Sequence, residues 1–269
     1  MIGAIIGDIV GSRFEHLNHK SKVFELFTPK NSFTDDTVMT LAVAKAIIET
    51  KKQDLIEKDY YQVLEKLTIK YMQELGRKYP YAGYGNMFYQ WIMSSNPKPY
   101  NSFGNGSAMR ISPVGFLAQS LEEALKHAEV ISSVTHNHPE GIKGAQAVVT
   151  CIYLAKRRYA KDDIRSEINE KYYNINFTLD EIRSTYHFNV TCQGSVPQAI
   201  VAFLEGTSFE DTIRNAISIG GDSDTIACIA GAIAECYFGV PEDIKNKALS
   251  YLDDDLSRIY QEWLDFISV

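Results

Sequence analysis

The sequence predicts an all-α fold, folded as a single compact domain over residues 1–269. Three observations support this. Apolar residues recur at helical spacing through most of the chain, no stretch alternates convincingly between apolar and polar residues as a half-buried strand does, and glycine, proline and N-capping residues separate the apolar stretches. With 269 residues, of which 45% are hydrophobic, the chain is long enough to bury one sizeable core. We expect about ten helical segments.

The overall charge excludes some classes of partner. A net charge of −7 and a pI near 5.4 give no general attraction to nucleic acid or to an anionic membrane. No apolar run reaches transmembrane length, and the N-terminus has no charged leader. The four cysteines form no CxxC pair, which favours reduced, buried thiols. We expect a cytoplasmic monomer that binds neither nucleic acid nor membrane.

The first predicted helix, Met1 to Val10, is apolar and should be buried. Its glycines recur every fourth residue at Gly3, Gly7 and Gly11, which leaves one face bare. Each glycine weakens an isolated helix by up to about 1 kcal/mol, so another element is expected to pack closely against that face. Asp8 and Glu15 lie off the glycine stripe. Glu15 is either solvated or directed at the acidic cluster that follows the polar loop 16–32.

Two acidic clusters each stand where a turn enters an apolar helix. Phe33-Thr34-Asp35-Asp36-Thr37 precedes the helix from about Asp36 to Lys51, and Gly220-Gly221-Asp222-Ser223-Asp224-Thr225 precedes Ile226 to Tyr237. Either cluster alone could simply cap a helix. Each, however, brings two carboxylates and a hydroxyl to a buried helix, where unpaired charges repel and a cation is expected. Oxygen donors favour Mg²⁺, Mn²⁺ or Ca²⁺ over Zn²⁺. Facing half-sites would hold two ions about 3.5–4 Å apart, as in metal-assisted hydrolases.

The segments between the two clusters read mainly as outer helices and loops. Leu55 to Arg77 is amphipathic, and Met87 to Met93 resumes the helix until Pro97 and Pro99. Gly104-Asn105-Gly106-Ser107 is a tight loop whose amides can approach a ligand such as phosphate, or a helix-entry turn capped by Ser107. The helix Leu121 to Val134 ends at Thr135-His136, and we expect His136 to contact a ligand or to be structural.

Later segments complete the helical pattern. Gly144 to Leu154 is rich in small residues and buried, whereas residues 156–187 are charged and irregular and suggest no chemistry. Pro197 lies near the first turn of a helix from Gln198 to Leu204. Phe209 to Ile219 leads into the second acidic cluster, and Lys245 to Phe266 forms one outer amphipathic segment.

Several of these motifs together resemble the ADP-ribosylglycohydrolases, the family of the hydrolase that removes ADP-ribose from dinitrogenase reductase. They occur in the family's order over nearly the whole chain, and they are Gly3-Ala4 to Gly7-Asp8 with Gly11 and Glu15, Phe33 to Thr37, Gly104 to Arg110, Thr135-His136, Ser195-Val196-Pro197 and Gly220 to Ala227. Residues 156–190 do not visibly follow the pattern, so that region could set specificity.

The resemblance implies an all-α domain with two Mg²⁺ or Mn²⁺ ions in a cleft. The implied ligands come from both acidic clusters: Thr34, Asp35, Asp36, Asp222, Asp224 and Thr225. Glu15 and Asp36 are the implied catalytic carboxylates, with Glu15 orienting water or substrate at the ions. The implied contacts to ADP-ribose are Ser102, Phe103, Gly104, Asn105, Gly106, Ser107 and His136.

The resemblance therefore implies hydrolysis of the N- or O-glycosidic bond between ADP-ribose and a protein side chain, with a small ADP-ribose conjugate as the other substrate class. The linked residue stays open. An all-α isoprenoid synthase also uses paired aspartates, but Val38-Met39-Thr40 stands where its motif would repeat Asp. A relative that binds ADP-ribose or a partner without turnover is the second alternative. The four aspartates and Glu15 argue against it.

Overall fold

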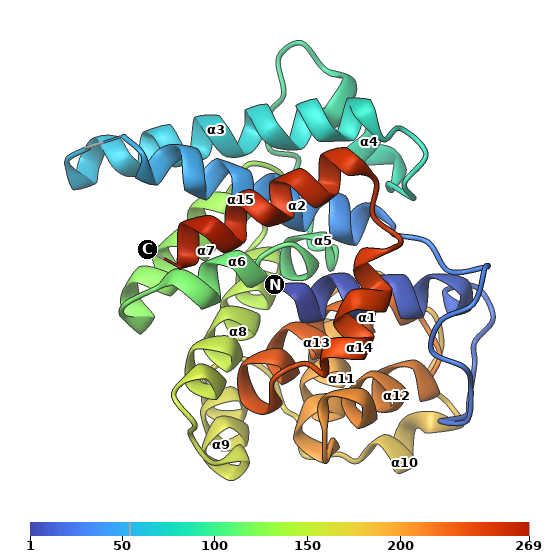
Figure 1. The fold of residues 1–269 in the computed structure, drawn as a ribbon. Coiled ribbons are helices and arrows are strands. Elements are labelled where there is room, and N and C mark those ends of the chain that lie inside the picture. The colour runs from blue at the N-terminus through green and yellow to red at the C-terminus, as the bar shows by residue number, and fades with distance from the viewer. Residues whose placement is uncertain (54, 269) are drawn as a thin grey trace.

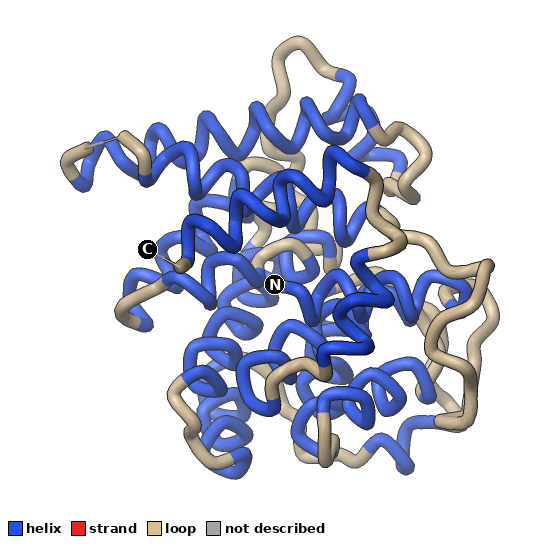
Figure 2. The backbone as a smooth tube through the Cα atoms, in the orientation of Figure 1, coloured by secondary structure: helices blue, strands red, loops and turns tan. Residues whose placement is uncertain are grey.

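The computed structural model describes residues 1–53 and 55–268, and within these it contains fifteen α-helices, one 3₁₀ helix and no strand (Figure 1, Figure 2). The all-α prediction is confirmed. The elements are α1 (Ile2–Gly11), the 3₁₀ helix η1 (Ser12–Phe14), α2 (Asp35–Lys51), α3 (Glu57–Lys78), α4 (Asn86–Met93), α5 (Gly106–Met109), α6 (Ser112–Leu117), α7 (Leu121–Ser133), α8 (Pro139–Lys156), α9 (Lys161–Lys171), α10 (Leu179–Arg183), α11 (Cys192–Glu205), α12 (Phe209–Ser218), α13 (Ser223–Phe238), α14 (Glu242–Leu249) and α15 (Asp254–Ile267).

Helices α1 and α13 lie side by side at the centre, and their backbones touch. A Cβ atom at Gly3 would lie 2.1 Å from the carbonyl oxygen of Gly231, and one at Gly7 would lie 2.0 Å from that of Ala227. At Gly11 the same atom would lie 2.5 Å from the Cα of Asp224. The predicted bare face of the first helix is therefore confirmed, and its partner is the helix that follows the second acidic cluster.

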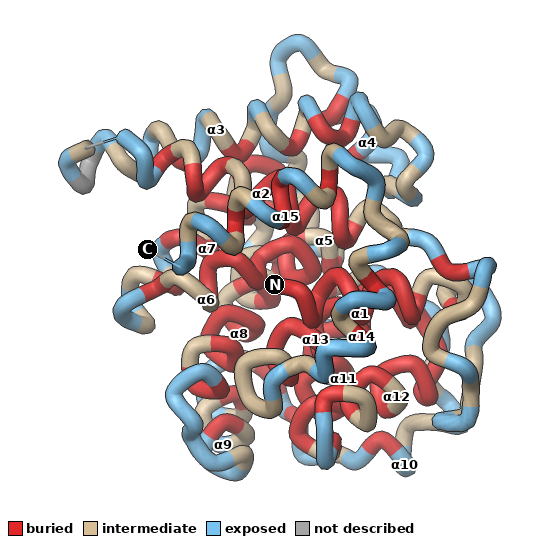
Figure 3. The backbone as a smooth tube through the Cα atoms, in the orientation of Figure 1, coloured by how far each residue is buried: buried red, intermediate tan, exposed pale blue. Residues whose placement is uncertain are grey.

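The other helices enclose this central pair in two groups. Helix α2 packs between α3 and α15 on one side, while α8, α11 and α12 pack against α13 on the other (Figure 1). Burial is concentrated in α1, α2, α8, α11 and α13, whereas α3 and α9 expose one face (Figure 3). No helix in the described ranges is long and apolar enough to span a membrane.

The structure corrects several predicted helix boundaries, mostly because polar side chains cap helices. The amphipathic segment predicted from Lys245 to Phe266 is divided between α14 and α15, because the Asp253 carboxylate accepts the N–H groups of Asp255 and Leu256 and starts α15. Helix α8 begins at Pro139, where His138 Nδ1 accepts the N–H of Glu140 at 3.1 Å.

Two further corrections concern the second half of the chain. Helix α11 begins at Cys192, capped by Thr191, so that Pro197 lies inside the helix rather than near its first turn. The segment read as irregular contains α9 and also α10, which starts at a capping box between Thr178 and Glu181.

The α1–α13 contact predicts that Gly7→Ala lowers the free energy of unfolding by about 3 kcal/mol, because the new methyl group forces two backbones apart. Chemical denaturation with urea measures the effect. Gly85→Ala is the matched control, since a Cβ at Gly85 meets nothing within 4 Å, and it should change stability by less than about 0.5 kcal/mol. Equal denaturation midpoints for the two variants would contradict the contact.

Candidate metal centre and its cleft

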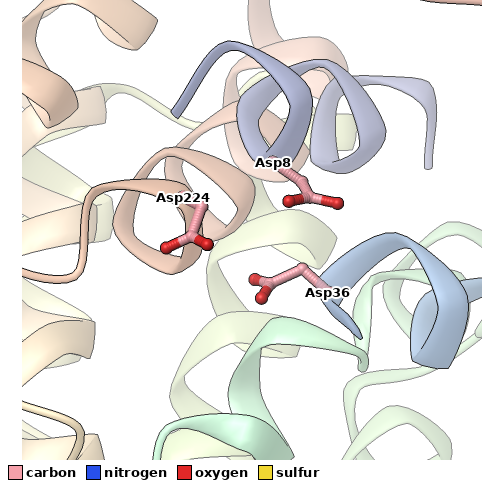
Figure 4. Close-up of side chains that lie close together, drawn as sticks. All are labelled: Asp8, Asp36 and Asp224. Atoms are coloured by element: carbon pink, nitrogen blue, oxygen red, sulfur yellow. The ribbon is translucent and has the colours of Figure 1, made fainter. Parts of the chain in front are cut away.

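Six carboxylates from four segments converge beside the central helix pair. They are Asp8 on α1, Glu15 after η1, Asp35 and Asp36 at the start of α2, and Asp222 and Asp224 at the start of α13. Asp8, Asp36 and Asp224 point toward one another (Figure 4), and one oxygen from each lies within 4.8 Å of the others. Glu15, Asp222 and Asp224 form a second such group. The two predicted acidic clusters therefore meet, and Asp224 belongs to both groups.

Asp8 joins the first helix to the second. Its Oδ2 accepts the N–H of Thr34 at 2.9 Å, the N–H of Thr37 at 3.0 Å and the Thr37 hydroxyl at 2.5 Å. Among the described residues, its Oδ1 accepts a hydrogen bond from the Thr34 hydroxyl alone, at 2.6 Å, so it can also bind a cation. Asp8 was not among the metal ligands predicted from the sequence. The available signal was a lone charged residue inside an otherwise apolar helix.

Asp36 has an oxygen that nothing in the described chain satisfies. Its Oδ2 accepts the Thr225 hydroxyl at 3.2 Å, whereas its Oδ1 is buried without a hydrogen-bond partner. The Thr34 hydroxyl lies beside it and accepts the N–H of Asp36 at 3.3 Å. Buried polar atoms are rarely left unpaired. A cation between Asp8, Asp36 and Asp224 would satisfy this oxygen.

The Gly104–Gly106 loop fixes one member of the second carboxylate group through a hydrogen bond. The Asn105 side-chain amide donates to Asp222 Oδ2 at 2.6 Å and to the Ser195 hydroxyl at 3.0 Å. Ser195 in turn donates to the Asn189 carbonyl at 2.8 Å. Glu15 is only half-buried and lies 3.7 Å from the His16 ring. The Asn105 amide, predicted to contact substrate, is thus directed at a carboxylate.

Burial makes this cluster electrostatically unfavourable without counter-charge. Burial raises the pKa of all six carboxyl groups, and repulsion from neighbouring carboxylates raises the pKa of Asp35, Asp36 and Asp224 further. The six carboxyl groups can avoid this repulsion either by staying partly protonated or by binding cations. Because the clustered donors are carboxylate oxygens, the residues fit Mg²⁺, Mn²⁺ or Ca²⁺.

A cavity of about 430 Å³ opens beside the carboxylates, a size that suits a small-molecule ligand. Of the predicted substrate residues, Ser102, Gly104, Asn105, Gly106 and His136 line it. The Ser107 hydroxyl instead donates to the Gly141 carbonyl at 2.7 Å, and the Phe103 ring packs on His138, with 5.2 Å between ring centroids.

Other lining residues were not predicted. They include Arg110, Phe88, Phe188 and Val190. Arg110 ends a recognised motif, whereas Phe188 lies within residues 156–190, which do not visibly follow the family pattern. Its ring lies 5.9 Å from that of His16, next to Glu15.

Known proteins resemble this chain over most of its length. A family model described as ADP-ribosylglycohydrolase matches residues 1–265. ADP-ribosylhydrolase ARH3 of Homo sapiens is 26% identical over 97% of this chain and 93% of its own. ADP-ribosylarginine hydrolase Tri1 of Pseudomonas putida (strain GB-1) is 25% identical over 98% of this chain and 76% of its own. A solved structure described as an ADP-ribosylglycohydrolase-related protein complex has the same fold, with a TM-score of 0.65, 20% identity and 96% coverage of both chains.

The raised pKa values predict that pH changes both the stability of the metal-free protein and the stabilisation that added metal provides. In chelator, the folded state keeps protons that the unfolded chain has lost, so the free energy of unfolding falls as the pH rises from about 5 to 8. Added Mg²⁺ should raise the melting temperature, and more at the higher pH, because protons compete with the ion. Calorimetry at several pH values measures both effects.

Asp36→Asn is the control for this prediction. With one carboxylate fewer, the chelated variant should lose less stability as the pH rises, and Mg²⁺ should stabilise it less. A melting temperature that Mg²⁺ leaves unchanged at every pH would contradict the metal centre.

Proposed function

The chain belongs to the ADP-ribosylglycohydrolase family, and we propose that it is a divalent-cation-dependent hydrolase that releases ADP-ribose from a modified protein side chain or from a small ADP-ribose conjugate. The observation that carries the proposal is the pair of carboxylate groups that share Asp224 at a cleft that the Gly104–Gly106 loop and His136 also line. The names of the two relatives, an ADP-ribosylhydrolase and an ADP-ribosylarginine hydrolase, support it.

The proposed ligands extend those predicted from the sequence. Asp8, Asp36 and Asp224 would hold one cation, and Glu15, Asp222 and Asp224 the other. Asp35, Thr34 and Thr225 stand next to these groups and complete the proposed donor set. When bound, Mg²⁺ or Mn²⁺ supplies Lewis-acid polarisation of ribose and water oxygens.

The protein's own residues would then carry the bond cleavage. A water attacks the anomeric carbon, and the bond from that carbon to the side-chain nitrogen or oxygen breaks, leaving its electron pair on the departing group. Glu15 takes the proton of the water and passes a proton to the departing nitrogen or oxygen, since Glu15 lines the cleft and burial raises its pKa. Asp36 stabilises the positive charge that develops on the sugar.

The Gly104–Gly106 loop and the residues beside it would bind the rest of ADP-ribose. Gly104 and Gly106 have no side chain between their backbone and the cavity, so a diphosphate can approach closely. Ser102 and His136 add polar groups beside them. Asn105 acts indirectly here, because its amide holds Asp222 in position.

The direct test measures release of ADP-ribose from Arg-linked and Ser-linked ADP-ribosylated peptides with Mg²⁺, with Mn²⁺ and with chelator. We expect metal-dependent release from at least one peptide. Asp224→Asn should lower the rate at least about 1000-fold, because both carboxylate groups lose a member. Asp243→Asn, at an exposed position on α14, is the matched control. Binding of ADP-ribose without turnover of either peptide would point instead to a different ADP-ribose conjugate as substrate or to a silent binding protein.

Glu15→Gln separates proton transfer from metal binding. If Glu15 accepts the proton, kcat falls at least about 100-fold, since proton transfer contributes that much or more. The loss should persist at saturating Mg²⁺ or Mn²⁺, which titration of the rate against metal concentration establishes. Full recovery of kcat at high metal concentration would leave Glu15 with a ligand role only.

A further inference from the structure

His136 presents a free ring nitrogen to the cleft. The residue lines the cavity and is only 5% exposed. Its Nε2 would lie 3.4 Å from a Cβ atom at Gly104 and 3.3 Å from one at Gly106, so it lies directly over the bare loop. Nothing in the described part of the chain hydrogen-bonds to this nitrogen. What Nε2 can do for a ligand depends on whether it carries a proton.

The hydrogen bond between His136 Nδ1 and Thr135 determines which ring nitrogen carries the proton. Nδ1 lies 2.7 Å from the Thr135 hydroxyl, and that hydroxyl accepts a hydrogen bond from Arg110 Nη2 at 2.8 Å. Arginine can only donate. If Nδ1 also donated, the hydroxyl proton of the fully buried Thr135 would have no acceptor among the described residues. The hydroxyl proton and Nδ1 both have partners when the Thr135 hydroxyl donates to Nδ1. In that case the proton of a neutral imidazole is on Nε2.

A doubly protonated ring is disfavoured in this position. Burial and the positive charge of Arg110 lower the pKa of His136 well below its ordinary value. Arg110 is itself 1% exposed, and burial lowers its pKa to about 10, so it keeps its charge at neutral pH. The backbone N–H of His136 donates to the Ser132 carbonyl at 2.7 Å, and the Tyr100 ring lies 6.1 Å away across the imidazole. The ring is therefore held in place on several sides.

The ligand that this wall would accept is an anion. Arg110 lines the same cavity, and its Nε is buried without a hydrogen-bond partner. The Nε2 donor of His136, with the positive charge of Arg110 behind it, thus stands beside a loop that has no side chains at Gly104 and Gly106. A phosphate oxygen would accept from Nε2 and offset the buried charge.

We propose that Thr135 is a positioning residue, which with Arg110 fixes His136 as a hydrogen-bond donor to a phosphate of the substrate and prevents it from acting as a base. This inference rests on the proposed function, since it concerns binding of the ADP-ribose diphosphate. Thr135 itself touches no substrate, because its hydroxyl is used by Arg110 and His136.

The tautomer can be read by long-range ¹H–¹⁵N NMR of the full-length, ¹⁵N-histidine-labelled protein, with His136 assigned by the signal that His136→Gln removes. We expect the neutral Nε2–H form between about pH 6 and pH 8. Thr135→Val, which keeps the side-chain shape, should spread the proton over both nitrogens, and Thr135→Ser should restore the original pattern. An Nδ1–H or cationic ring at neutral pH in the unaltered protein would overturn the inference, and this reading needs no variant of Thr135.

Binding and kinetics provide a second readout. Thr135→Val should raise the Kd for ADP-ribose and the KM for the modified peptide about tenfold, with kcat nearly unchanged, and Thr135→Ser should restore both constants. A fall in kcat with unchanged KM would contradict a binding role. Neither the spectrum nor ADP-ribose binding needs turnover, so an inactive enzyme would refute the proposed function and leave the tautomer to be judged separately.

Discussion

Mutual repulsion among buried carboxylates is the constraint on which this molecule depends. Six acidic side chains share one cleft, and burial penalises the charged form of each. A protein that needs only a stable core would not keep them. The helices around the cleft hold the carboxylates at short range at a cost in stability, and cations would offset that cost.

The scaffold meets this constraint with two local devices. Backbone contact between α1 and α13, permitted by Gly3 and Gly7, sets Asp8 and Asp224 side by side. Asp8 then caps α2 through Thr34 and Thr37, and so orients Asp36 as well. The acidic residues are thus fixed by helix packing and capping, which positions ligands more accurately than a flexible loop does.

The sequence allowed prediction of the features that depend on local pattern. Helical periodicity indicated the all-α fold, the glycine spacing indicated a close helix contact, and paired aspartates at two helix starts indicated a cation site. Features that depend on tertiary contacts could not be predicted from the sequence. Asp8 is a single residue whose role appears only when α1 meets α2, and the roles of Arg110 and Phe188 depend on segments brought together by folding. Capping by Asp253 and by Thr178 involves short-range polar contacts that apolar periodicity does not register.

Because Asp224 belongs to both carboxylate groups, occupancy of the two proposed cation positions would be thermodynamically linked. A first divalent ion would relieve the repulsion among the remaining carboxylates, but it would also compete for the shared carboxylate and repel a second ion. The affinity of either position would therefore depend on whether the other is filled.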